Sequence, residues 1–69
     1  MIDIVTLSRA KRDYCLDAGT ELALAEKYAG MGAAHTATYH ANRAVIMLAR
    51  ANDIARFFTT MSVAQGEAA

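Results

Sequence analysis

Small and large residues alternate at helical spacing through the second half of the chain. Steps of four and three residues are typical of the stripe along which one α-helix packs against another. We therefore predict a helix over about residues 33–63, followed by a frayed tail over 64–69. Its packed stripe consists of Ala37, His40, Ala44, Met47, Ala51, Ile54, Phe58 and Met61.

The first half of the chain carries a similar pattern. Apolar residues between Ile4 and Ala29 gather on one face, with Leu22 among them, and the acidic residues are spread largely over the rest. Asp3 precedes this face, and its carboxylate can accept hydrogen bonds from the free N–H groups of a first helical turn. These features predict a helix over about residues 3–29, with Leu22 in its packed face.

Two glycines separate the predicted helices, at positions 30 and 32 on either side of Met31. Glycine closes helices because it adopts the left-handed conformation without a Cβ clash. A turn over residues 30–32 is short enough to place the helices antiparallel, so we predict an all-α helical hairpin with residues 1–69 in a single domain. Each hairpin leaves one side of its helix contact open. We therefore expect a homodimer that forms a four-helix bundle.

The size and composition of the chain also favour self-association. The chain has 69 residues, of which 55% are hydrophobic, and it contains no proline. A core of this size rarely supplies more than about 3–5 kcal/mol of stability, and oligomerisation commonly supplies the remainder. Cys15 is the single cysteine, so a disulfide within the chain is excluded. The formal net charge of zero gives no general attraction to nucleic acid or to an anionic membrane.

The compartment is predicted from the hydrophobic runs and the lone cysteine. The first residues do not combine a basic region with a long apolar run, as a signal peptide does. The longest apolar run, from Ala44 to Ala49, is far shorter than the roughly 20 residues that span a membrane. A single cysteine is typical of a reducing compartment. We expect a soluble protein of the cytoplasm that does not interact with membranes.

No catalytic, metal-binding or nucleotide-binding motif emerges. Ser8 and Lys11 match the Ser-x-x-Lys pattern of some acyl enzymes, but the companion motifs are missing. His35 and His40 are five residues apart, which places them on nearly opposite sides of a helix and prevents them from sharing a metal ion. We therefore expect no enzymatic activity, no cofactor and no metal. We interpret Cys15 as a packed thiol and His40 as a buried polar group bonded across the dimer.

The second helix has two flanks beside its packed stripe. One flank carries mostly small or aliphatic residues, which suit close packing within the hairpin or the dimer: Ala41, Val45, Leu48 and Ala55. The other flank combines aromatic residues with arginine, the residue types that are enriched at binding hot spots. Its members are Tyr39, Arg43, Ile46, Arg50 and Phe57.

We predict that this aromatic and arginine flank binds a partner protein. Leu24 and Tyr28 of the first helix are expected to point away from the helix contact and to extend the same surface. In an alternative interpretation, Tyr39 and Phe57 complete the dimer core. Arg43, Arg50 and Arg56 also form a basic ridge, which we interpret as a solvated edge and not as a nucleic-acid site.

The length, the hairpin organisation and the alanine-rich composition of the whole chain resemble the small phage-encoded quorum-sensing anti-activators. The resemblance implies a helical-hairpin dimer in the cytoplasm of the host bacterium. It also implies two host partners, which are the DNA-binding domain of a LuxR-type transcription activator and the type IV pilus assembly ATPase. The residues associated with this resemblance are Tyr39, Arg43 and Ile46.

The chain also resembles the RNA-binding helical hairpins that control plasmid copy number, which are short dimers with alternating small and large core layers. That family reads an RNA duplex with a basic and polar ridge on its first helices. Here the first helix carries four basic residues among five acids. An RNA-binding hairpin and a structural or assembly module therefore stay open as alternatives to a protein-binding inhibitor.

Overall fold

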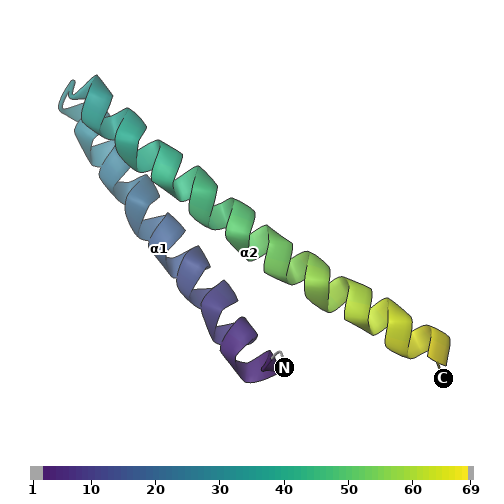
Figure 1. The fold of residues 1–69 in the computed structure, drawn as a ribbon. Helices are drawn as coiled ribbons and strands as arrows, with labels where there is room; N and C mark the ends of the chain where they lie inside the picture. The colour runs from purple at the N-terminus through teal and green to yellow at the C-terminus, as the bar shows by residue number, and fades with distance from the viewer. Residues whose placement is uncertain (1–2, 69) are drawn as a thin grey trace.

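The computed structural model describes residues 3–68 as two helices joined by a tight turn, with α1 over Ile4–Gly30 and α2 over Ala34–Ala68 (Figure 1). The predicted all-helical hairpin is confirmed. α2 continues beyond the predicted end near Val63, because the chain up to Ala68 holds no proline and consists mostly of helix-forming residues. Residue 69, the last of the predicted tail, lies outside the described residues.

Asp3 caps the start of α1, as the sequence predicts. Its Oδ1 accepts a hydrogen bond from the backbone N–H of Val5 at 3.0 Å, and its Oδ2 accepts one from the Thr6 hydroxyl at 2.8 Å. The Thr6 hydroxyl first, and then the Val5 N–H, lower the pKa of the Asp3 carboxyl below its ordinary value. The ionised carboxylate thus satisfies donors that the helix itself leaves free.

The turn between the helices is a Schellman motif. Gly32 has a φ of +77°, its N–H donates to the carbonyl of Ala29 at 3.1 Å, and the N–H of Ala33 donates to the carbonyl of Tyr28 at 2.9 Å. This pair of bonds satisfies carbonyls at the end of α1 and requires a left-handed residue at the position of Gly32. The predicted role of the glycine pair is therefore confirmed at Gly32.

Alanines bring the two helices close together. The residues that lose nearly all their exposure, among those described, are Ala18 of α1 and Ala44 and Ala51 of α2. The predicted stripe of α2 is confirmed, since every member is buried or half-buried: Ala37, His40, Ala44, Met47, Ala51, Ile54, Phe58 and Met61.

The packed face of α1 differs from the prediction. Leu22 is 44% exposed, and Cys15 and Ala29 are exposed as well, so these residues lie outside the contact between α1 and α2. The place of Leu22 in a dimer core stays a prediction. The contact follows the heptad series Leu7, Tyr14, Glu21 and Tyr28, whose members are all half-buried, and of these Leu7 and Tyr14 belong to the predicted apolar face. A step of one residue turns a side chain by about 100° around a helix, so Leu22 lies beside this line.

The hairpin is a thin rod of 56 × 18 × 15 Å. The helices lie side by side at the turn and separate toward their free ends, where α2 extends beyond the start of α1 (Figure 1). No large side chain of the described residues is fully buried. Neither helix, over the residues described, is long and apolar enough to cross a membrane.

Candidate protein-binding surface

A carboxylate of α1 joins two polar side chains of α2. Glu21 Oε2 lies 2.5 Å from His40 Nδ1, and Glu21 Oε1 accepts a hydrogen bond from Arg43 Nε at 3.1 Å. Because an ionised carboxylate can only accept, His40 carries its hydrogen on Nδ1 in this contact. The exposed fractions of the Glu21 and His40 side chains are only 14% and 17%, so the bonds lie in a partly dehydrated setting.

These hydrogen bonds shift the pKa values of Glu21 and Arg43. The hydrogen bond from His40 first, and then that from Arg43, hold the pKa of the Glu21 carboxyl below its ordinary 4.5, although partial burial opposes the shift. The pKa of Arg43 is raised, first of all by its hydrogen bond to Glu21. Glu21 therefore stays ionised and holds Arg43 in place at neutral pH.

Aromatic rings surround the imidazole of His40. The Tyr28 ring stacks on it with centroids 5.5 Å apart, and the Tyr39 ring meets it edge-on at 5.1 Å. Arg43 lies over Tyr39, with its guanidinium carbon 5.6 Å from the ring centroid, and its Nη1 donates to the Tyr39 hydroxyl at 3.4 Å. We call these five residues, Glu21, Tyr28, Tyr39, His40 and Arg43, the Glu21 cluster.

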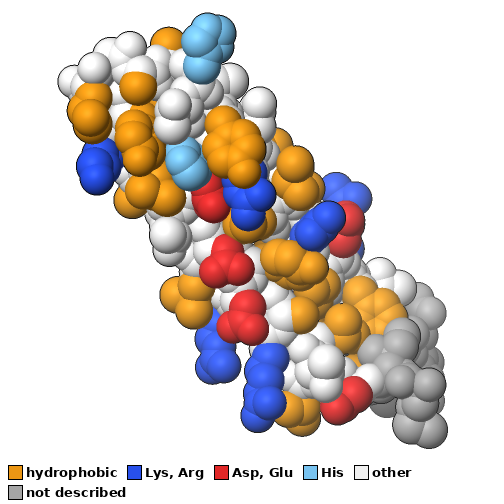
Figure 2. All heavy atoms as spheres, turned by 60° about the vertical axis from the view of Figure 1, so that its left-hand side comes forward, with side chains coloured by type: hydrophobic (Ala, Val, Ile, Leu, Met, Phe, Trp, Pro, Cys, Tyr) orange, Lys and Arg blue, Asp and Glu red, His pale blue; other side chains and the backbone are white. Residues whose placement is uncertain are grey.

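The outer side of the cluster is a surface of exposed apolar and cationic groups. Tyr39 and Ile46 are 57% and 52% exposed, and Arg50 lies over the ring of Tyr14 at 5.7 Å. A shallow groove of about 220 Å³ runs beside them, lined by Arg43, Ile46, Met47 and Arg50. Figure 2 shows basic, acidic and apolar side chains mixed along one face of the rod.

The structure brings together four of the seven predicted partner residues, namely Tyr39, Arg43, Ile46 and Arg50, along one exposed side of α2. Phe57 is half-buried, with its ring 6.0 Å from that of Phe58. Leu24 and Tyr28 are half-buried too, so the expectation that they point away from the helix contact is wrong. Tyr28 instead contacts the site through its ring, which stacks on the imidazole of His40.

Sequence reasoning missed Glu21. Glu21 belongs to the heptad series from Leu7 to Tyr28, and that spacing of seven was the available signal. The imidazole of His40 is bonded to Glu21 of its own chain, and the predicted bond of His40 across a dimer stays a prediction. An acid at a packed position is unusual, but here two donors of the neighbouring helix satisfy it.

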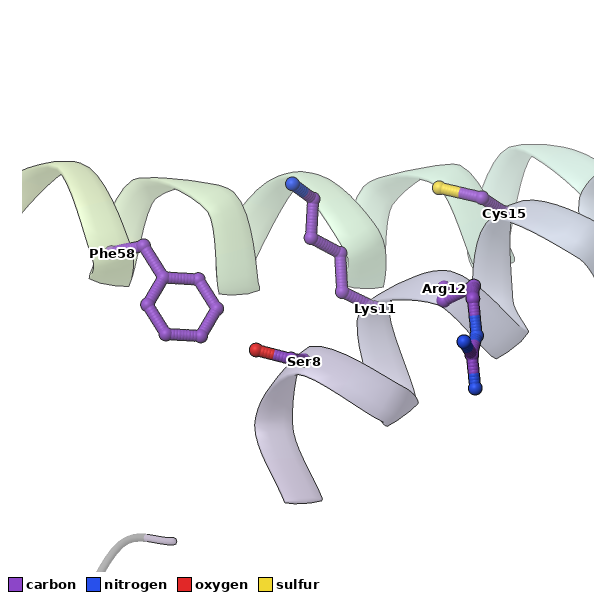
Figure 3. A pocket seen from close by; sticks show the side chains of 5 residues that line it. All are labelled: Ser8, Lys11, Arg12, Cys15 and Phe58. Carbon is purple, nitrogen blue, oxygen red and sulfur yellow. The ribbon is translucent and has the colours of Figure 1, made fainter. Parts of the chain in front are cut away.

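The hairpin carries two further grooves. A groove of about 320 Å³ lies near the turn, and its lining residues are Ala25, Glu26, Ala29, Ala37, Thr38 and Ala41. A groove of about 490 Å³ lies near the free ends, and it is lined by Ser8, Lys11, Arg12, Cys15 and Phe58. In Figure 3 the Phe58 ring faces Ser8, Lys11 extends alongside α2, and Arg12 turns away from it.

Comparisons of the chain with protein-family models, with curated proteins and with solved structures found no match. In the part of the chain that the structure describes, no three His, Cys, Asp or Glu side chains come together as a metal site would require. The functional interpretation therefore depends on the Glu21 cluster, the exposed flank beside it and the resemblance of the chain.

Proposed function

We propose that this hairpin is a non-catalytic, phage-encoded inhibitor that acts by binding host proteins in the cytoplasm. The observation that carries the proposal is the exposed flank of Tyr39, Arg43, Ile46 and Arg50, which supplies aromatic, aliphatic and guanidinium groups within a few turns of one helix. Tyrosine and arginine are enriched among residues that dominate binding energy. A helix that presents such a flank suits a groove or a helical surface of a partner.

The Glu21 cluster prepares this flank for binding. Arg43 is held by Glu21, and the Tyr39 ring is held by His40 and Arg43 before any partner arrives. Side chains that are already ordered lose less conformational entropy when they become part of an interface. The cluster therefore supports a role of Tyr39 as an anchor and of Arg43 as a group that pairs with acidic or aromatic side chains of the partner.

The partners that we propose follow from the resemblance to quorum-sensing anti-activators. The principal target is the helix-turn-helix domain of a host LuxR-type activator, which loses access to DNA when the hairpin covers it. The type IV pilus assembly ATPase is a second target. We also propose that the active form is a homodimer of four-helix-bundle type, because a single hairpin leaves apolar residues of both helices exposed.

A direct binding assay tests the target and the surface together. Operator DNA carrying a fluorophore is bound to the purified helix-turn-helix domain, and the hairpin is titrated in while anisotropy is recorded. The wild type should release the DNA, and Tyr39→Ala should need about 30-fold more protein, which corresponds to about 2 kcal/mol. Circular dichroism should show unchanged helicity in the variant.

Leu16→Ala is the matched control, because Leu16 is another large apolar residue, 64% exposed, on the outer side of α1. It should displace DNA as the wild type does. If Tyr39→Ala is equally active, the assigned surface is wrong. If the wild type leaves the DNA bound and instead binds an RNA duplex with an affinity that falls steeply with salt, the RNA-binding alternative is correct.

A further inference from the structure

The hairpin exposes far more surface than a compact protein of its mass. Its accessible area is 5214 Å², whereas a folded monomer of 7.4 kDa is expected to expose about 4200 Å². The radius of gyration is 16.1 Å, against about 11 Å for a globular chain of this length. The excess of about 1000 Å² matches the roughly 800 Å² that each partner buries in a standard protein interface.

The helical repeat turns a second flank of each helix away from the Glu21 cluster, and this flank carries small and apolar residues. On α1 the series Ser8, Cys15, Leu22 and Ala29 follows a spacing of seven, and on α2 the series Ala41, Leu48 and Ala55 does the same. Leu22 and Leu48 are each 44% exposed. We call the surface formed by these two series and the two grooves the alanine face. Its small residues allow the close approach of another pair of helices, and its two leucines supply apolar area to bury.

Charge is distributed unequally along the alanine face. The only charged residue that lines the groove near the turn is Glu26, whereas the groove near the free ends is lined by Lys11 and Arg12. Arg12 and Glu26 are fourteen residues apart, two heptads along the same side of α1. If two copies met with their turns at the same end, like charges would lie together. If the copies met with their turns at opposite ends, the acid of each copy would lie near the bases of the other.

We propose that a second copy of this chain covers the alanine face in an antiparallel, two-fold arrangement, with the turns at opposite ends of the dimer. The proposal rests on the homodimer of the proposed function and adds its surface and its orientation, but it needs none of the proposed targets. It leaves the Glu21 cluster of each copy on an outer side of the bundle. The dimer therefore presents two identical target surfaces.

A distance measurement between two spin labels tests the orientation. Met31 is 67% exposed at the turn, so a nitroxide is attached through a keto-bearing unnatural amino acid at position 31, which leaves Cys15 of the alanine face unchanged. In the antiparallel dimer the two turns should be about 40 Å apart, from 1.5 Å per residue along helices of this length. A distance below about 25 Å would show a parallel dimer, and the absence of a dipolar signal at high concentration would show a monomer. Either result overturns the proposal.

A matched pair of substitutions tests the face. Leu48→Glu puts a charge on the alanine face, and Ile46→Glu puts the same charge on the cluster side at a comparable exposure. Analytical ultracentrifugation should show that Leu48→Glu raises the dissociation constant of the dimer at least about 30-fold, while Ile46→Glu changes it less than about threefold. A larger increase of the dissociation constant for Ile46→Glu than for Leu48→Glu would place the dimer interface on the cluster side.

Exchange of the charges gives an independent test of the orientation. Arg12→Glu and Glu26→Arg should each weaken the dimer, because each places like charges together across an antiparallel interface. The double variant should recover most of the wild-type dissociation constant. If the losses of dimer affinity in the two single variants add up in the double variant, the antiparallel pairing is contradicted. These measurements use the hairpin alone, so a failure here is distinct from a failure to find the target.

Discussion

At the residue scale, Glu21 is the side chain on which the proposed site depends most. It is an acid on the packed line of α1, yet it is satisfied because His40 and Arg43 of α2 approach its two oxygens. The same contacts fix Arg43 beside Tyr39, and so they couple the packing of the hairpin to the shape of its outer surface. A change at Glu21 is therefore expected to affect both stability and target binding.

The stability of the hairpin should depend on the ionisation of Glu21. Because its pKa is lower in the folded state than the ordinary 4.5, the unfolded chain binds the proton more readily. The stabilisation is thus fully present above about pH 5 and is lost as the pH falls through the folded-state pKa. Urea unfolding midpoints followed from pH 7 to pH 3 should fall more steeply for the wild type than for Glu21→Gln.

The control for this titration is Asp17→Asn, which removes an exposed carboxylate of α1 one turn earlier. It should keep most of the acid sensitivity of the wild type. Asp3 also has a lowered pKa, so some acid sensitivity should remain in Glu21→Gln. Identical slopes for the wild type and Glu21→Gln would show that the cluster contributes nothing to folding.

At the element scale, α2 is predictable from the sequence and α1 is less so. The packed stripe of α2 alternates alanine with large residues, and this pattern predicts a single line of contact with another helix. α1 offers two neighbouring lines of similar apolarity, one through Cys15 and Leu22 and one through Tyr14 and Glu21. The prediction kept the apolar residues of both lines on one face and left Glu21 outside it. The acid fits the contact only because α2 supplies its donors, and that information lies in the other helix.

Close packing at the alanines of α2 gives a prediction for the helix contact. Ala44 is fully buried against α1, so Ala44→Leu should force the helices apart. Overpacking of this kind typically costs about 1–3 kcal/mol, which urea unfolding measures directly. Ala49→Leu, at an exposed position of the same helix, should leave the stability nearly unchanged. Equal effects of the two substitutions would contradict the observed contact.

At the scale of the whole molecule, the hairpin has two unlike sides. The alanine face carries small apolar residues, with an acid near the turn and bases near the free ends. The cluster side carries aromatic and cationic residues. The sequence predicted both flanks of α2 and left open whether Tyr39 belongs to a dimer core. The structure places Tyr39 against His40 with more than half of its surface exposed in the single hairpin, and its place in a target surface stays our proposal. Self-association and target binding can then use separate surfaces.

The mass of the complex with the target tests this division most directly. Light scattering coupled to size-exclusion chromatography would be carried out on the hairpin alone and with the helix-turn-helix domain in excess. We predict a dimer of 7.4 kDa chains that persists in the complex and carries two target domains. A complex that contains a single hairpin chain would show that the target displaces the second copy, and it would contradict separate surfaces.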